Sequence, residues 1–152
     1  LAKTWSSELA SIAQGWASRC LWQFGQPARP QRPYDYTEQL LYAYIGDLNP
    51  LRAIQSFYGE KPFYDYDSGN CTGEACGITH SVHICNLSQL VWASTKDVGC
   101  AYTYCPNIMV GNLTGASFMI CNYGPAGNWL DQKPYSEEAA CSECGWCEDD
   151  LC

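Results

Sequence analysis

Eleven cysteines in a chain of 152 residues limit the possible folds more than any other feature of this sequence. Reducing compartments do not maintain so many disulfides, so the cysteine content favours an extracellular or lumenal protein. The competing interpretation is a cytosolic protein with several zinc ions, which would need closely spaced cysteine pairs with matching partners. Only Cys141, Cys144 and Cys147 are spaced in that way. We therefore predict a secreted domain that is held together by disulfides.

Three N-glycosylation sequons agree with secretion, and they begin at Asn70, Asn86 and Asn112. No apolar run approaches the roughly 18–20 residues that a membrane span requires, so no transmembrane segment is expected. No signal peptide is visible either, and we expect the chain to be a mature or trimmed form.

The chain is acidic, with a formal net charge of −8 and only 8 Lys and Arg residues. Nucleic acid is not an expected partner, because phosphate contacts require Lys and Arg. Acidic residues crowd near the end of the chain, between residues 137 and 150. For these residues we favour a solvated, solubilising surface over a patch that binds cations or a basic partner.

Two helices are predicted in the first part of the chain. Apolar residues recur at gaps of three and four from Thr4 to Cys20, which predicts an amphipathic helix. Asn49 followed by Pro50 is typical of a helix start, because Asn caps the first turn and Pro fits the first helical position. A further short helix is predicted over residues 88–95.

Strands are predicted in the second part of the chain. Residues 98–105 and 117–123 are rich in β-branched and aromatic residues, and the turn-rich stretch between them indicates an antiparallel hairpin. Residues 36–45 fit either a short helix or a strand. Helices followed by a strand pair indicate an α+β domain.

Four motifs follow one another along the chain. They are Trp5-Ser-Ser-Glu-Leu-Ala10 with Trp16-Ala17-x-x-Cys20; Asn86-Leu-Ser-Gln-Leu-Val-Trp-Ala-Ser-Thr95 followed by Val98-Gly99-Cys100; Cys121-Asn-Tyr-Gly-Pro-Ala-Gly-Asn-Trp129 followed by Lys133-Pro134-Tyr135; and Cys141-x-x-Cys144-x-x-Cys147-x4-Cys152. In this order they resemble the signatures of one family, the CAP superfamily (cysteine-rich secretory proteins, antigen 5, pathogenesis-related 1).

The resemblance implies a three-layer α-β-α sandwich over residues 1–136 and a short cysteine-rich, hinge-like tail over residues 137–152. Family members usually carry one more helix before the segment that begins at Trp5, and this chain is expected to lack it. Such a domain would expose apolar core that something must cover.

The resemblance also implies a set of disulfides. It pairs Cys20 with Cys105 and Cys100 with Cys121 in the sandwich, and Cys141 with Cys147 and Cys144 with Cys152 in the tail. Cys71, Cys76 and Cys85 remain. Two of these are expected to close the loop between residues 64 and 77. The third is left over, which suggests an intermolecular bond or a partner in the missing segment before Trp5.

Many members of the family hold a divalent metal, typically zinc, with two His and two Glu. Glu38 and Glu60 occupy the positions of the two Glu, whereas Phe24 and Asn86 replace the two His. Phenylalanine cannot ligate a metal, and a lone amide oxygen suits zinc poorly. We therefore expect a degenerate site without zinc, in which two carboxyl groups repel each other and one can take up a proton.

Three details of this site stay open. Asn86 either carries a glycan that closes the cleft or is an unmodified, hydrogen-bonded side chain, and its burial decides between the two. His80 and His83 could form a replacement metal site with Asp65 or Asp67, although surface residues are the preferred interpretation. Ser88 lacks the histidine that would activate it as a nucleophile.

We therefore predict a secreted, non-enzymatic binding or structural module that carries N-linked glycans and no other cofactor. Its expected partners are extracellular proteins or further copies of the chain, joined through tyrosines, glycans or the odd cysteine. The alternatives are a carrier of lipid or sterol, a defence or toxin-like protein, and a hydrolase that uses the remaining carboxyl groups.

Overall fold

A four-stranded sheet forms the centre of the computed structural model, which describes residues 2–25, 33–72, 77–79, 82–109, 113–137, 141–142 and 145–147. Its strands are β1 (Thr4–Trp5), β2 (Glu38–Ile45), β5 (Asp97–Ile108) and β6 (Leu113–Gly124), in the order β1-β5-β6-β2. β5 and β6 form a long antiparallel hairpin, β2 pairs antiparallel with β6, and β1 pairs parallel with β5. The predicted hairpin is confirmed, and the ambiguous stretch 36–45 contains a strand.

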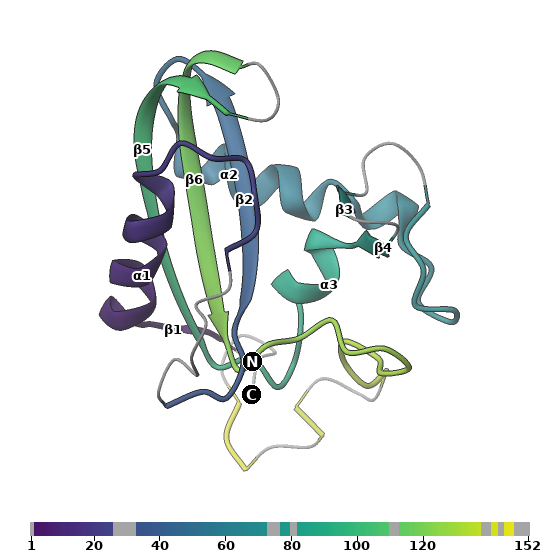
Figure 1. Cartoon of the computed structure of the whole chain (residues 1–152). Helices are drawn as coiled ribbons and strands as arrows, with labels where there is room; N and C mark the ends of the chain where they lie inside the picture. Colours follow the sequence, from purple (N-terminus) through teal and green to yellow (C-terminus); the bar gives the residue numbers. More distant parts are fainter. Residues whose placement is uncertain are drawn as a thin grey trace.

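Helix α1 (Ser7–Ala17) covers one face of the sheet (Figure 1). The Ser6 side chain caps it by accepting a hydrogen bond from the Leu9 backbone nitrogen at 3.2 Å. Leu9, Ala13 and Ala17 recur every fourth residue and are buried. The predicted helix began too early, at Thr4, because Thr4 and Trp5 instead bond to β5 as strand β1.

Helices α2 (Pro50–Tyr58) and α3 (Asn86–Leu90) lie on the opposite face (Figure 1). The predicted cap is confirmed, because the Asn49 side chain accepts a hydrogen bond from Leu51. A short 3-10 helix (Lys61–Phe63) follows α2, and a small hairpin of β3 (Gly77–Thr79) and β4 (Val82–Ile84) precedes α3. These layers confirm the predicted three-layer α-β-α sandwich.

The predicted short helix was displaced: α3 begins at Asn86 rather than Ser88 and is shorter than predicted. After α3, Ala93 donates a backbone hydrogen bond to the Pro134 carbonyl, and Lys96 donates one to Gly124. These bonds to the last residue of β6 and to the segment after it replace helical ones, which is why the helix ends early.

Two apolar cores lie on either side of β6. On the α1 face, Ala116, Phe118 and Ile120 pack with α1, whereas on the α2 face Met119 and Cys121 pack with α2. Successive residues of a strand point to opposite faces, so one strand supplies both cores.

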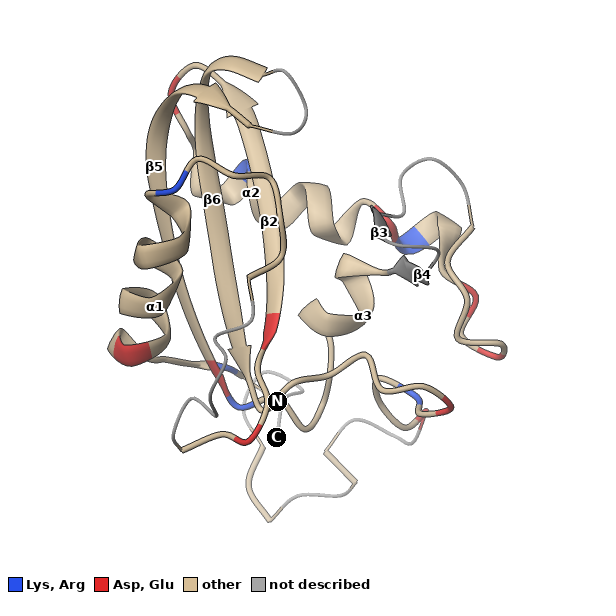
Figure 2. Cartoon of the chain, viewed as in Figure 1, with Lys and Arg blue, Asp and Glu red and all other residues tan. Residues whose placement is uncertain are grey.

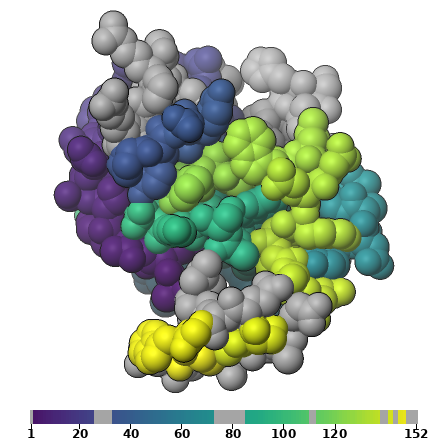
Figure 3. Space-filling model, turned by 90° about the horizontal axis from the view of Figure 1, so that it is seen from below, coloured from purple at the N-terminus to yellow at the C-terminus, as the bar shows by residue number. Residues whose placement is uncertain are grey.

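Three disulfides of the described residues match those that the resemblance implied: Cys20–Cys105, Cys100–Cys121 and Cys141–Cys147. Cys100 and Cys121 are direct partners across β5 and β6. Cys144, Cys152 and Cys76 lie outside the described residues. The described tail residues 141–142 and 145–147 lie at the edge of the domain (Figure 3). The boundary between domain and tail stays a prediction.

Gly99 allows α1 to approach β5 closely. A Cβ atom at Gly99 would overlap the backbone nitrogen of Ala10 and lie 2.5 Å from the Ser6 carbonyl oxygen. We expect Gly99→Ala to lower the free energy of unfolding by about 1–3 kcal/mol, because the backbone of α1 must move. Gly15→Ala is the matched control, since nothing lies within 4 Å of its Cβ position. It should raise helix propensity and stability by up to about 1 kcal/mol. Urea unfolding of both variants measures the contrast, and an equal effect would contradict the close approach.

Candidate functional site

Glu60 is the buried polar group around which the candidate site is built. It follows the end of α2 and is only 3% exposed. Its Oε1 accepts a hydrogen bond from Asn86 Nδ2 at 2.5 Å, and its Oε2 accepts one from the Leu87 backbone nitrogen at 3.0 Å. The Cys85 thiol donates to the same Oε2 at 3.4 Å. Glu60 therefore joins the end of α2 to the start of α3.

These contacts give the Glu60 carboxyl group a structural role. The first backbone N–H groups of a helix have no partner within the helix, and Glu60 satisfies the one at Leu87. Asn86, at a predicted metal-ligand position, points its amide N–H toward Glu60. The pair is thus a donor facing an acceptor, which is not how two ligands of one cation are arranged.

Glu38 lies at the start of β2, opposite Tyr123 of β6, and is partly buried. Burial raises the pKa of this carboxyl group to about 7, against a weaker opposite effect of a hydrogen bond from the Gln39 backbone. From the sequence we expected repulsion between two carboxyl groups to favour the uptake of a proton. Burial, rather than a second charge, is the cause here.

Phe24 does not join the other predicted site residues. Its ring packs against the core cluster on the α1 face, with residues such as Phe118. The structure therefore brings Glu60 and Asn86 into contact and holds Glu38 on β2. Since Phe24 has no donor atom and the Asn86 amide N–H faces Glu60, these residues do not fit a zinc ion.

Among the described cysteines, Cys85 carries a free thiol. Its side chain is buried and 5% exposed, whereas Cys71 is 4% exposed and disulfide-bonded. The sulfur atoms of both residues and a carboxyl oxygen of Glu60 lie within 4.8 Å of one another. The sequence left open which cysteine is unpaired, because no spacing distinguishes Cys85 from its neighbours in the loop.

Ser88 is buried in this region, and neither of its described side-chain hydrogen-bond partners is a base. Its Oγ lies 2.8 Å from the Cys85 carbonyl oxygen and 2.5 Å from Asn128 Oδ1. Neither group removes a proton, so the hydroxyl serves as a hydrogen-bond donor inside the fold. The metal candidate His80 lies outside the described residues, and of His83 only the backbone, in β4, is described.

Gln89 joins the two signature motifs, a role that sequence reasoning missed. Its Nε2 donates to Thr95 Oγ1 at 3.0 Å, and its Oε1 accepts from the Gly127 backbone nitrogen at 2.7 Å. Thr95 in turn donates to the Pro125 carbonyl at 2.9 Å. The segment after β6 is thereby fixed against α3. In the sequence, Gln89 is the polar residue that immediately precedes the apolar run of residues 90–93.

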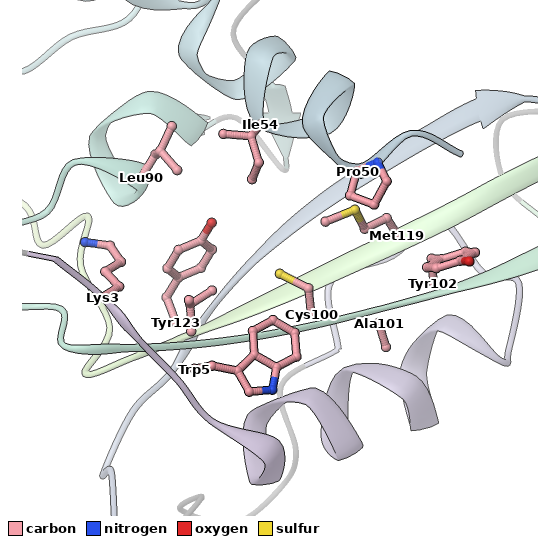
Figure 4. Close-up of a pocket in the computed structure, with 11 residues that line it drawn as sticks. Lys3, Trp5, Pro50, Ile54, Leu90, Cys100, Ala101, Tyr102, Met119 and Tyr123 are labelled. Carbon is pink, nitrogen blue, oxygen red and sulfur yellow. The ribbon is translucent and has the colours of Figure 1, made fainter. Parts of the chain in front are cut away.

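An apolar groove with a volume of about 460 Å³ lies on the α2 face of the sheet (Figure 4). Ile54 of α2 and Leu90 of α3 face side chains of β5 and β6 across it. The other lining residues are Lys3, Trp5, Pro50, Val98, Cys100, Ala101, Tyr102, Met119 and Tyr123. No motif in the sequence indicated this groove, and the exposed core expected from a missing first helix stays a prediction.

Lys3 supplies the one amine among the lining residues of the groove. Its Nζ donates to the carbonyl oxygens of Trp92 at 3.1 Å and Thr95 at 3.5 Å. Burial lowers the pKa of this amine. Elsewhere, the described Lys and Arg residues are few and far apart (Figure 2).

The fold and the site together define a class of disulfide-linked α-β-α sandwiches with an apolar groove between the sheet and helices α2 and α3. The chain belongs to the cysteine-rich secretory protein (CAP) family, because the model of that family matches residues 2–123. The predicted family is therefore confirmed. None of the helices in the described part of the chain is long and apolar enough to cross a membrane.

Two relatives illustrate the similarity. GLIPR1-like protein 1 of Homo sapiens is 35% identical over 145 residues, which are 92% of this chain and 55% of that protein. Cysteine-rich secretory protein LCCL domain-containing 2 of Homo sapiens is 34% identical over 158 residues, or 98% of this chain and 31% of that protein. The chain thus spans about half of the first relative and under a third of the second.

Solved structures share the fold. The crystal structure of NaASP2 with Zn2+ superposes with a TM-score of 0.70 at 24% identity, covering 99% of this chain and 75% of that chain. The structure of BmVAL-1 superposes with a TM-score of 0.64 at 27% identity, covering 91% of this chain and 66% of that chain.

The raised pKa of Glu38 makes the free energy of unfolding depend on pH. The folded protein keeps a proton that the unfolded chain loses above about pH 4.5, so stability falls as the pH rises to about 7. We expect Glu38→Gln to raise the free energy of unfolding by about 1–2 kcal/mol at about pH 8 and to change it little at about pH 4.5. Urea unfolding at both pH values measures this. Glu8→Gln, at an exposed position on α1, is the control and should show no gain at alkaline pH. A gain for Glu38→Gln at both pH values would contradict the burial effect.

The hydrogen bond from Asn86 to Glu60 predicts which N-glycosylation sequons are occupied. Asn70 is exposed, whereas Asn86 is half-buried with its amide nitrogen on Glu60. For protein secreted by eukaryotic cells, we expect a glycan at Asn70 and none at Asn86. Enzymatic deglycosylation in heavy-oxygen water, followed by peptide mass spectrometry, identifies the occupied sites. Asn70→Gln should remove one glycan, and Asn86→Gln should remove none. A glycan at Asn86 would contradict the Asn86–Glu60 contact and close the cleft.

Proposed function

We propose that this chain is a non-enzymatic extracellular binding and assembly module that uses the apolar groove on the α2 face. The observation that carries the proposal is the groove itself, because open apolar surfaces on stable domains usually mark binding sites. Aromatic rings stand at its edge: the Tyr102 side chain is 55% exposed and that of Trp5 is 61% exposed. Such rings bury a large area at an interface and are frequent binding hot spots.

The candidate site supports a non-enzymatic role. A hydrolase would need a nucleophile with a base, or a metal with open ligands. The Glu60 carboxyl group is instead occupied by hydrogen bonds to Asn86, Leu87 and Cys85. NaASP2 was crystallised with Zn2+, but the residues of this chain at the family's metal positions do not form a zinc-ligand set.

Several features support an extracellular location. Three disulfides join described residues, and such bonds persist in oxidising compartments. The family and one of the relatives carry the word secretory in their names. The chain carries acidic charge and few cations, which agrees with a soluble extracellular surface rather than one for nucleic acid.

A second candidate function is a carrier of lipid or sterol. The volume of the groove, about 460 Å³, falls within the range of small-molecule sites. Its lining is nearly all apolar, and the Lys3 amine, which also lines it, could bind the polar head group of a lipid. A carrier would bind its ligand as a monomer, whereas the assembly module would associate through the same surface.

A substitution of Tyr102 distinguishes the assembly module from the carrier. We expect the purified protein to self-associate, and Tyr102→Glu to weaken this association about tenfold, because a charge would be buried at a hot spot. Tyr104→Glu is the matched control: it lies two residues further along β5, is 61% exposed and does not line the groove. Analytical ultracentrifugation measures the association.

Binding of radiolabelled cholesterol to the same variants gives the second readout. Saturable binding to monomers that Tyr102→Glu weakens and Tyr104→Glu leaves intact would support the carrier. A monomeric protein without cholesterol binding, or equal effects of the two substitutions, would contradict a binding role of the groove.

A further inference from the structure

A free thiol lies beside a disulfide in the small core between α2 and α3. The Cys85 sulfur, the Cys71 sulfur and a Glu60 carboxyl oxygen lie within 4.8 Å of one another. Cys71 is disulfide-bonded and Cys85 is free. Leu87, Tyr64 and Val91 surround the two sulfur-bearing residues. A thiol at this distance from a disulfide has the arrangement from which exchange begins.

We propose that Cys85 exchanges with the Cys71 disulfide, so that Cys71 bonds either to its present partner or to Cys85. In this step the Cys85 thiol loses its proton and its sulfur attacks the Cys71 sulfur. The Cys71–Cys85 bond forms as the bond from Cys71 to its present partner breaks. The partner sulfur leaves with the electron pair and takes up a proton. One thiol and one disulfide exist before and after, so no oxidant or reductant is consumed.

The surroundings hold the thiol in place. Glu60 Oε2 accepts the Cys85 thiol hydrogen at 3.4 Å and also accepts from the Leu87 backbone nitrogen. Cys71 is held by a backbone β-bridge to Tyr64. The two sulfurs are thus positioned by independent backbone segments. Glu60 acts as a positioning residue, and its carboxyl group is near enough to receive the thiol proton.

Burial also explains why the thiol survives in an oxidising compartment. It raises the pKa of Cys85 to about 11, so the unreactive thiol form dominates near neutral pH. The side chain is shielded from dissolved oxidants and from other chains. The sulfur of Cys71 is its nearest described electrophile, and exchange within the molecule is therefore favoured over reaction with other molecules.

Disulfide mapping of the whole, unreduced protein tests the proposal. The protein is held near pH 8, quenched with acid, unfolded, alkylated under mildly acidic conditions that prevent exchange, and digested without reduction. We expect peptides that contain a Cys71–Cys85 bond, together with alkyl label on a cysteine other than Cys85. Label on Cys85 alone, with no Cys71–Cys85 peptide even after incubation with a trace of small thiol, would overturn the proposal.

Two controls separate exchange from general scrambling. Bonds from Cys85 to Cys100 or Cys121 should be absent, because that disulfide lies within the β5–β6 pair. If they appear as often as Cys71–Cys85, exchange is unspecific and the proposal is wrong. In the Cys85→Ser variant, no alkyl label is expected on Cys71 or on any of the other cysteines that the structure describes. If the Cys85→Ser variant does not fold, Cys85→Ala takes its place.

Glu60→Gln tests the role of Glu60 in the exchange. The substitution keeps the size of the side chain but removes a group that can receive the thiol proton. We therefore expect the two disulfide pairings of Cys71 to reach equilibrium about fivefold or more slowly. The exchange rate and the urea midpoint of unfolding are both measured for this variant, so that an effect on exchange can be distinguished from a loss of stability. A loss of stability with an unchanged rate would restrict Glu60 to a purely structural role.

Discussion

The structure depends on the burial of β6 on both faces. Alternate residues of this strand enter the two cores, with Phe118 and Ile120 on the α1 side and Met119 and Cys121 on the α2 side. A slip of one residue between β5 and β6 would exchange the two sets. The Cys100–Cys121 disulfide joins residues that are direct partners in this register. It therefore holds the pairing on which both helical layers depend.

Helix α3 is too short to be stable alone, and buried polar side chains hold it. Glu60 binds its start, and Gln89, from within the helix, binds the segment after β6. The Glu60 carboxyl group therefore has a structural role that does not depend on a bound metal. Removing such a group would leave buried N–H donors without partners, which costs about 1–3 kcal/mol each.

The sequence was informative wherever a local pattern sets the structure. The helical spacing that gave α1, the cap at Asn49 and the hairpin depend on neighbouring residues, and the family motifs added the disulfides. What could not be predicted depends on distant partners. Strand β1 exists because Trp5 pairs with Val98, and Glu60 meets Asn86 only in the folded chain. The groove and the free thiol of Cys85 are likewise products of packing, which no spacing records.

Helix α3 connects the two features that carry the functional proposals. Cys85 immediately precedes it, beside the sulfur of Cys71, and Leu90 at its other end lines the apolar groove. A helix of this length moves as one unit, because all its backbone hydrogen bonds fall within little more than a turn. The buried sulfurs and the wall of the groove are therefore attached to opposite ends of the same short helix.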